Sequence, residues 1–135
     1  MAEPIRILFL CTGNSARSIM AESIANHLFT GRIEAISAGS DPKDSPHPLA
    51  LETLRRHGLS TDFLYSKSVD EIVGHDVDLV VTLCDLAASG SCPTPLAGVP
   101  RRHWGFPDPP TQPDPDAAFD AVYRGLVAAM EEFLA

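Results

Sequence analysis

Two apolar segments of this chain each run into a cysteine. Residues 5–10 read IRILFL and are followed by Cys11, and residues 77–84 read VDLVVTLC and end on Cys84. Nearly continuous apolar runs of this kind are typical of central parallel strands that are covered on both faces. The two cysteines are therefore predicted to lie at the ends of buried strands.

Helical and β-rich patterns alternate along the rest of the chain. Apolar side chains recur at helical spacing over residues 20–28, within residues 45–58 and from Asp114 onward, where Asp114 can cap the last helix. Shorter β-rich segments lie at residues 33–37 and 101–104, and we expect the second of these to be an edge strand. This alternation predicts an α/β fold.

Strands that alternate with helices imply a layered domain. We expect one domain over residues 1–135, a three-layer fold with a small central parallel sheet of about four strands and helices on both faces. In such sheets, ligands bind at the carboxyl ends of the strands, where both Cys11 and Cys84 are predicted to lie. Any binding site is therefore expected at this edge of the sheet.

The net charge of the chain limits the kinds of partner that it can bind. The chain has 10 Lys and Arg residues against 18 Asp and Glu, a net charge of −8, and no run of basic residues. We expect no nucleic-acid or membrane partner, because their phosphates would be repelled. No apolar run approaches the roughly 18–20 residues that span a bilayer, and the apolar start is too short for a signal peptide. We therefore expect a cytoplasmic protein, and we also expect it to be a monomer.

The loop after the first strand predicts an oxyanion site. Backbone N–H groups between a strand end and a helix N-terminus converge on one concavity, and the helix dipole adds partial positive charge. Arg17 adds a planar, bidentate donor, and the same field lowers the pKa of the Cys11 thiol. Gly13 and Asn14 tolerate the positive φ that such a loop requires. The predicted oxyanion-binding residues are Thr12, Gly13, Asn14, Ser15, Ala16, Arg17 and Ser18.

Two alternatives apply to this loop. A nucleotide-binding loop is disfavoured, because the chain contains neither G-x-x-x-x-G-K-[ST] nor G-x-G-x-x-G. The other alternative is a buried strand-end cysteine with an unrelated surface arginine. Ser15 and Ser18 can each cap the helix or donate to the anion, and for Ser18 a hydrogen bond to the Cys11 thiolate is the further option.

The segment CTGNSARS after ILFL resembles the active-site loop of the low-molecular-weight tyrosine phosphatases and of the arsenate reductases built on the same fold. Both groups use an aspartate near the C-terminus as general acid, and Asp108 in HWGFPDPP is the candidate. In the phosphatases, tyrosines usually follow this aspartate and wall an aromatic slot. Here Pro110, Thr111 and Gln112 follow instead, and the segment is similar to the reductase version.

The cysteine pair Cys84 and Cys92 is similar to the redox segment of those reductases. The resemblance implies that Cys11 attacks arsenate while Asp108 protonates the leaving oxygen. A disulfide then passes from Cys11–Cys84 to Cys84–Cys92. We expect no tightly bound cofactor. The implied reductant is thioredoxin, or glutaredoxin with glutathione, and related enzymes use mycothiol. Phosphate and sulfate would compete with arsenate.

The spacing of that cysteine pair adds a condition. Eight residues of regular helix would separate Cys84 from Cys92 by about 12 Å, whereas a disulfide needs Cα atoms about 4.4–6.8 Å apart. We therefore predict that this segment changes conformation on oxidation. Cys84 and Cys92 are also one position farther apart in the sequence than the resemblance implies for arsenate reductases that use thioredoxin. A zinc site is disfavoured, because no second close cysteine pair is present.

Some relatives of this kind bind potassium near the loop, through residues that match Asn14, Glu22 and Ser37 and through one aspartate. Lys67 occupies the place of that aspartate. A cation beside another cation costs Coulomb energy, so we predict that Lys67 replaces the ion and that no metal binds. Asn14 and Glu22 are then expected to stiffen the loop through hydrogen bonds.

Two other functions remain open from the sequence. The first is a phosphatase that acts on phosphotyrosine or small phosphomonoesters through a phosphocysteine at Cys11. The second is an oxyanion or redox sensor that binds without turnover. Loss of Asp108 would slow either enzyme and would barely affect a sensor.

Overall fold

A computed structural model of the chain describes residues 3–72, 76–83, 98–107 and 109–135. Its centre is a sheet of four parallel strands in the order β2-β1-β3-β4. This arrangement confirms the predicted α/β class and the parallel sheet. The strands are β1 (Ile5–Cys11), β2 (Ile33–Gly39), β3 (Leu79–Thr82) and β4 (Arg101–His103).

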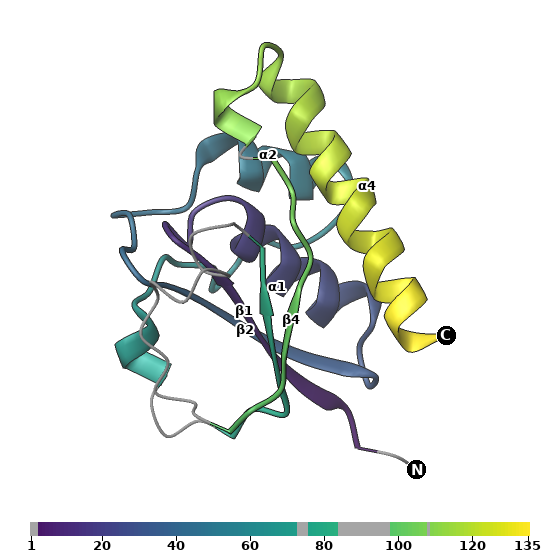
Figure 1. Cartoon of the computed structure of the whole chain (residues 1–135). Coiled ribbons are helices and arrows are strands. Elements are labelled where there is room, and N and C mark those ends of the chain that lie inside the picture. Colours follow the sequence, from purple (N-terminus) through teal and green to yellow (C-terminus); the bar gives the residue numbers. More distant parts are fainter. Residues whose placement is uncertain (1–2, 73–75, 84–97, 108) are drawn as a thin grey trace.

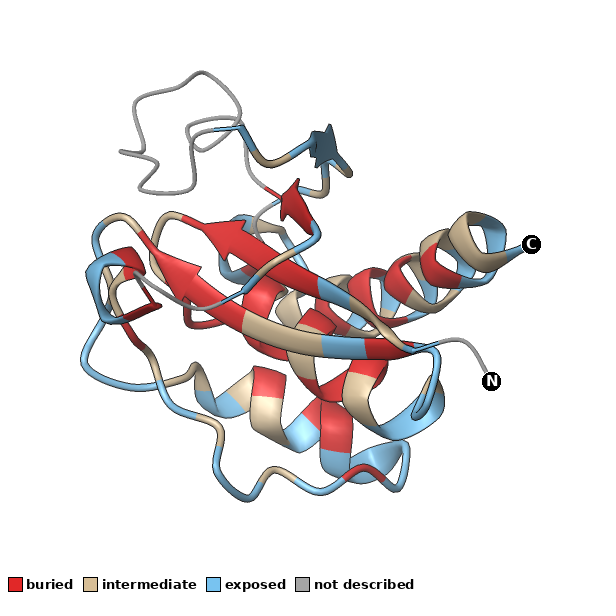
Figure 2. Cartoon of the chain, turned by 90° about the horizontal axis from the view of Figure 1, so that it is seen from below, coloured by how far each residue is buried: buried red, intermediate tan, exposed pale blue. Residues whose placement is uncertain are grey.

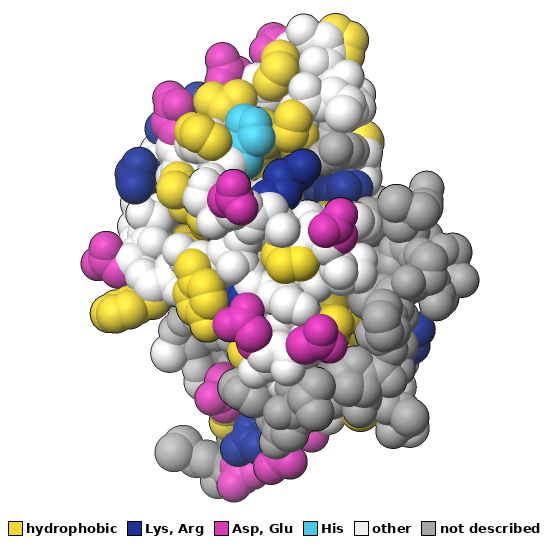
Figure 3. Space-filling view, turned by 90° about the vertical axis from the view of Figure 1, so that its left-hand side faces the viewer, with side chains coloured by type: hydrophobic (Ala, Val, Ile, Leu, Met, Phe, Trp, Pro, Cys, Tyr) yellow, Lys and Arg dark blue, Asp and Glu magenta, His cyan; other side chains and the backbone are white. Residues whose placement is uncertain are grey.

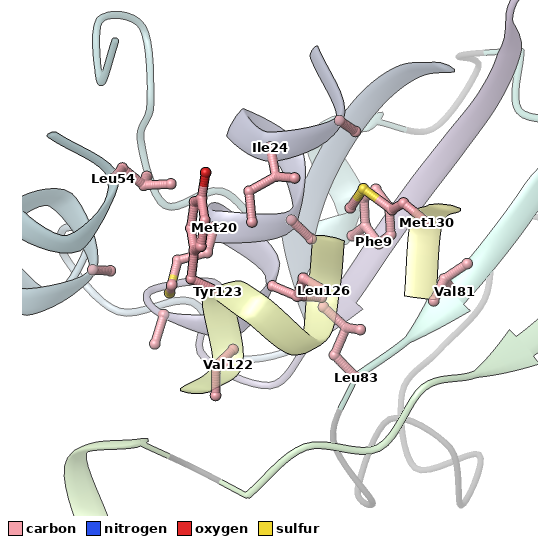
Figure 4. Close-up of a cluster of buried hydrophobic side chains, with 14 of the residues drawn as sticks. Phe9, Met20, Ile24, Leu54, Val81, Leu83, Val122, Tyr123, Leu126 and Met130 are labelled. Carbon is pink, nitrogen blue, oxygen red and sulfur yellow. The ribbon is translucent and has the colours of Figure 1, made fainter. Parts of the chain in front are cut away.

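The three described α-helices lie on one face of this sheet, and a short 3₁₀ helix packs on the other (Figures 1 and 2). Three α-helices share one apolar cluster with the β1 side chains Ile7 and Phe9, and Figure 4 shows its centre. Leu8 and Leu10 point to the other face, where they pack with Val69 and Ile72. The helices are α1 (Arg17–Leu28), α2 (Pro48–Arg56) and α4 (Pro115–Leu134), and the 3₁₀ helices are η1 (Val69–Ile72) and η2 (Pro109–Thr111).

The observed strand bounds differ from the predicted ones, most of all in β3 and β2. β3 begins at Leu79 and not at residue 77. Just before it, the Asp78 N–H donates to the Arg6 carbonyl oxygen at 2.9 Å, while the Asp78 carboxylate accepts the Arg6 N–H at 2.9 Å. β2 continues past residue 37 to Gly39, where it runs alongside Cys11. The edge position of β4 agrees with the prediction.

The helix ends follow ordinary capping chemistry. The Asp114 side chain accepts the Ala117 N–H at 3.3 Å, which confirms the predicted cap of α4. The α2 N-cap is His47, whose ring nitrogen accepts the Leu49 N–H at 3.1 Å. For α1 the N-cap position is Ala16, and no side chain caps it. The suggested capping roles of Ser15 and Ser18 are therefore wrong.

Side chains of helices α2 and α4 pack against each other near the carboxyl ends of the strands. The His47 ring packs on Phe119 with ring centroids 5.0 Å apart. Further along, His57 stacks on Tyr123 at 3.8 Å and shares a 2.8 Å hydrogen bond with Asp120. That hydrogen bond holds the pKa of the Asp120 carboxyl below its ordinary value. Within the described parts of the chain, no helix has the length and apolar character needed to cross a membrane.

Candidate active site

Residues 11–18, which we call the anion loop, connect β1 to α1. Cys11 is the last residue of β1, and only 5% of its surface is exposed. Because β1 lies between β2 and β3, Cys11 sits at the carboxyl edge of a central strand. Arg17 is the first residue of α1, so the loop ends at a helix N-terminus as predicted. A tetrahedral oxyanion fits such a position.

The anion loop is braced by residues 41–47, which run alongside it. Three loop carbonyls accept hydrogen bonds from backbone N–H groups of this segment. The bonds run from Asp41 to Thr12 at 2.9 Å, from Lys43 to Gly13 at 2.9 Å and from His47 to Ser15 at 2.8 Å. Because these carbonyls are engaged on the outside of the loop, its own N–H groups can serve an anion on the inside.

Asn14 is the most constrained residue of the loop. It is fully buried and adopts a positive φ of 45°. Its amide nitrogen donates to Ser18 Oγ at 2.8 Å, and its amide oxygen accepts the Lys67 N–H at 2.8 Å. Asn14, and not Gly13, therefore adopts the left-handed conformation. Its side chain is hydrogen-bonded to Ser18 within the loop and to Lys67 outside it.

Gly39 is a functional residue that sequence reasoning missed. A Cβ atom at this position would lie 2.5 Å from the Thr12 carbonyl oxygen, 2.9 Å from that of Cys11 and 3.0 Å from the Asn14 nitrogen. The end of β2 therefore approaches the anion loop more closely than any side chain allows. A glycine at the end of a strand was the only signal in the sequence.

We expect Gly39→Ala to displace the anion loop. The methyl group meets backbone atoms, so the substitution should cost about 1–3 kcal/mol of stability. Because the loop atoms must shift, the Kd for inorganic phosphate should rise about tenfold or more. Thermal unfolding and titration calorimetry measure the two effects.

Gly31→Ala is the matched control for that substitution. Gly31 has a φ of 84° but nothing within 4 Å of the added methyl group, and it lies in the turn between α1 and β2. It should lose stability through backbone strain while it keeps the wild-type phosphate affinity. Equal phosphate binding by both variants would contradict the assignment of Gly39 to the loop.

Arg17 connects the anion loop to the segment before the predicted general acid. Its Nη1 atom donates to the Phe106 carbonyl oxygen at 2.8 Å. Phe106 lies two positions before Asp108 in the sequence. The predicted residues Cys84, Cys92 and Asp108 lie outside the described residues.

The strand that leads to Cys84 lies directly beside β1. Leu83, the last described residue before Cys84, donates its N–H to the Leu10 carbonyl oxygen at 2.9 Å. Leu10 is followed by Cys11. The approach to Cys84 therefore runs along the strand that carries the candidate nucleophile.

A buried ion pair lies behind the loop. Lys67 Nζ is 3.2 Å from Glu22 Oε1, and the same carboxylate oxygen accepts a 2.6 Å hydrogen bond from Ser37 Oγ. Over the described residues, no three His, Cys, Asp or Glu side chains gather where they would hold a metal ion. On the face shown in Figure 3, the described acidic and basic side chains are interspersed. An anion must therefore be attracted by groups of the anion loop itself and not by the charge of the surrounding surface.

This fold and loop place the chain in a known enzyme class. It belongs to the low molecular weight phosphotyrosine protein phosphatase family, whose family model matches residues 6–135. The family and the fold expected from the resemblance are confirmed.

Within that family, the chain is similar to several arsenate reductases. Arsenate reductase 2 of Staphylococcus epidermidis is 35% identical over 127 residues, which cover 94% of each chain. The solved structure of an arsenate reductase from Archaeoglobus fulgidus is 26% identical, with a TM-score of 0.78 over 95% of this chain and 98% of that one. Another solved arsenate reductase, in a phosphate-binding state, is 25% identical, with a TM-score of 0.77 over 96% of each chain. The resemblance to this branch is confirmed.

Proposed function

We propose that this protein reduces arsenate to arsenite. The observation that carries the proposal is the buried Cys11 at the floor of a braced anion loop that ends in Arg17. Arsenate is a tetrahedral oxyanion, so the loop's N–H groups and the Arg17 guanidinium suit its charge and shape. The relatives named as arsenate reductases support the same choice of substrate.

The first step is nucleophilic attack on arsenic. The Cys11 thiolate forms a bond to arsenic, and one arsenate oxygen leaves as water after Asp108 supplies a proton. The helix N-terminus and Arg17 stabilise both the thiolate and the oxyanion. The Arg17–Phe106 hydrogen bond supports this step, because it holds the segment before Asp108 against the loop.

The second step transfers two electrons to arsenic. The Cys84 thiolate attacks the Cys11 sulfur, an S–S bond forms, and the electrons of the S–As bond remain on arsenic, which leaves as arsenite. Cys92 then attacks Cys84, which frees the Cys11 thiolate and leaves a Cys84–Cys92 disulfide. The Leu83–Leu10 hydrogen bond supports this relay, because it sets the approach to Cys84 beside the strand of Cys11.

An external thiol system completes the cycle by reducing that disulfide. We propose thioredoxin, or glutaredoxin with glutathione, as the reductant. No tightly bound cofactor is required, since all the electrons pass through cysteines. The relay needs reduced thiols between turnovers, which suits the reducing cytoplasm. We also propose that the enzyme is a monomer with a single domain over residues 1–135.

The test is arsenate-dependent oxidation of NADPH, coupled to thioredoxin and its reductase and separately to glutaredoxin with glutathione. We expect turnover with one system and its complete loss in Cys84→Ser. The matched variant Cys92→Ser should accumulate a Cys11–Cys84 disulfide after one exposure to arsenate, as measured by mass spectrometry.

Two outcomes would overturn the proposal. In the first outcome, the wild type and Cys84→Ser hydrolyse an aryl phosphate equally well, and arsenate is not reduced with either thiol system or with mycothiol. The protein would then be a phosphatase. Oxyanion binding without either turnover would make it a sensor.

A further inference from the structure

A buried lysine lies directly behind the anion loop. The Lys67 side chain is only 5% exposed, and Nζ lies 3.2 Å from Glu22 Oε1 and 3.1 Å from the Tyr65 carbonyl oxygen. The ammonium also lies 4.4 Å from the centre of the Tyr65 ring. Ser37 Oγ donates to the same Glu22 oxygen at 2.6 Å. Lysine is rarely this buried unless it is paired, as it is here.

The backbone of Lys67 forms hydrogen bonds to the anion loop and to β2. Its N–H donates to Asn14 Oδ1 at 2.8 Å, and its carbonyl oxygen accepts the Gly39 N–H at 2.9 Å. Lys67 therefore connects the left-handed residue of the loop, the close approach of β2 and a carboxylate on α1. A shift of its ammonium would be transmitted to Asn14 through one residue.

Potassium does not fit this environment. A hard monovalent cation would seek carboxylate, carbonyl and hydroxyl oxygens such as those of Glu22, Tyr65 and Ser37. The Lys67 ammonium already lies between the first two of these groups. A second cation at hydrogen-bond range would be repelled by it.

We propose that Lys67 is a built-in cation that holds the anion loop in its binding conformation, so that oxyanion binding does not depend on potassium. Lys67 is a positioning residue, since it acts on the anion through Asn14. The inference deepens the proposed function because it concerns the same loop. Its test, however, uses inorganic phosphate and thermal unfolding, neither of which requires turnover.

The first experiment uses the wild-type protein. Phosphate affinity is measured by titration calorimetry, and Tm by circular dichroism, in KCl, NaCl and choline chloride at equal ionic strength. We expect the same Kd and the same Tm in all three salts. Tighter phosphate binding or a higher Tm in KCl alone would overturn the proposal. Failure of arsenate turnover with unchanged salt results would count against the proposed function only.

The second experiment removes the ammonium. Lys67→Met keeps an unbranched side chain one atom shorter than lysine and leaves the Glu22 carboxylate without its charged partner. We expect Tm to fall by at least about 5 °C and the phosphate Kd to rise about tenfold. Adding Glu22→Gln to Lys67→Met should recover part of the Tm. A wild-type Kd for phosphate in Lys67→Met would overturn the proposal.

Two further variants separate positioning from general stability. Arg6→Met removes exposed ion pairs to Glu34 and Asp76 at the far end of β1, and it should leave the phosphate Kd unchanged. Lys67→Ala leaves room where the ammonium was, so KCl, but not choline chloride, should recover its phosphate affinity. Absence of that recovery would mean that the ammonium does not stand in a cation's place, which contradicts the proposal.

Discussion

Cys11→Ser is expected to lose at least about 10⁴-fold in arsenate turnover while it still binds phosphate. A serine hydroxyl is a far weaker nucleophile than a thiolate, so the bond to arsenic does not form. The anion loop is held by backbone hydrogen bonds from residues 41–47 and by Asn14, and none of these needs the thiol. Single-turnover assays with arsenate and calorimetry with phosphate measure the two properties on one preparation.

The comparison with Cys84→Ser makes that result specific. Cys84→Ser should still form the adduct between Cys11 and arsenic, whereas Cys11→Ser should form none. Mass spectrometry after rapid quenching distinguishes the two. Arsenate turnover in Cys11→Ser close to that of the wild type would rule out Cys11 as the nucleophile.

Arg17→Lys is expected to lower kcat/KM for arsenate by about 10²–10³-fold. Lysine keeps the charge but loses the planar pair of donors that matches two oxygens of a tetrahedral anion. It also loses the geometry of the 2.8 Å hydrogen bond to the Phe106 carbonyl, which holds the segment before Asp108. Steady-state kinetics and the phosphate Kd report the combined loss.

Arg32→Lys provides the control for that substitution. The Arg32 guanidinium also donates to a backbone carbonyl, that of Leu134 at 3.0 Å, but at an exposed position. It should retain wild-type kinetics, because an exposed hydrogen bond of this kind contributes little. If both variants behaved alike, the guanidinium at position 17 would have no special role.

Much of the fold could be predicted because its signals are local. The apolar run before Cys11, the helical spacing over residues 20–28 and the cap at Asp114 each lie within a few residues. The structure places β1, α1 and the start of α4 accordingly. The signal that predicts the anion loop is local as well, since a strand, a cysteine, a glycine, an arginine and a helix follow one another in the sequence.

The parts that could not be predicted depend on contacts between distant residues. Gly39 matters because its backbone lies against Thr12 and Cys11, and the glycine itself is the only local sign of this close approach. The choice of Asn14 over Gly13 for the positive φ depends on Lys67, 53 positions away, whose N–H the amide oxygen accepts. The replacement of an ion by Lys67 followed only from the resemblance, because spacing alone does not bring Lys67 to Glu22.

Three hydrogen bonds between main-chain atoms join residues 41–47 to the loop, and this has an evolutionary consequence. The bonds to Thr12, Gly13 and Ser15 would form with almost any non-proline residue at positions 41, 43 and 47. Asp41, Asp44 and Ser45 are exposed. Natural drift or a directed library can therefore vary the charge at the rim of the site while the nucleophile and its cradle stay intact. Selectivity among oxyanions is free to evolve there at little cost to the chemistry.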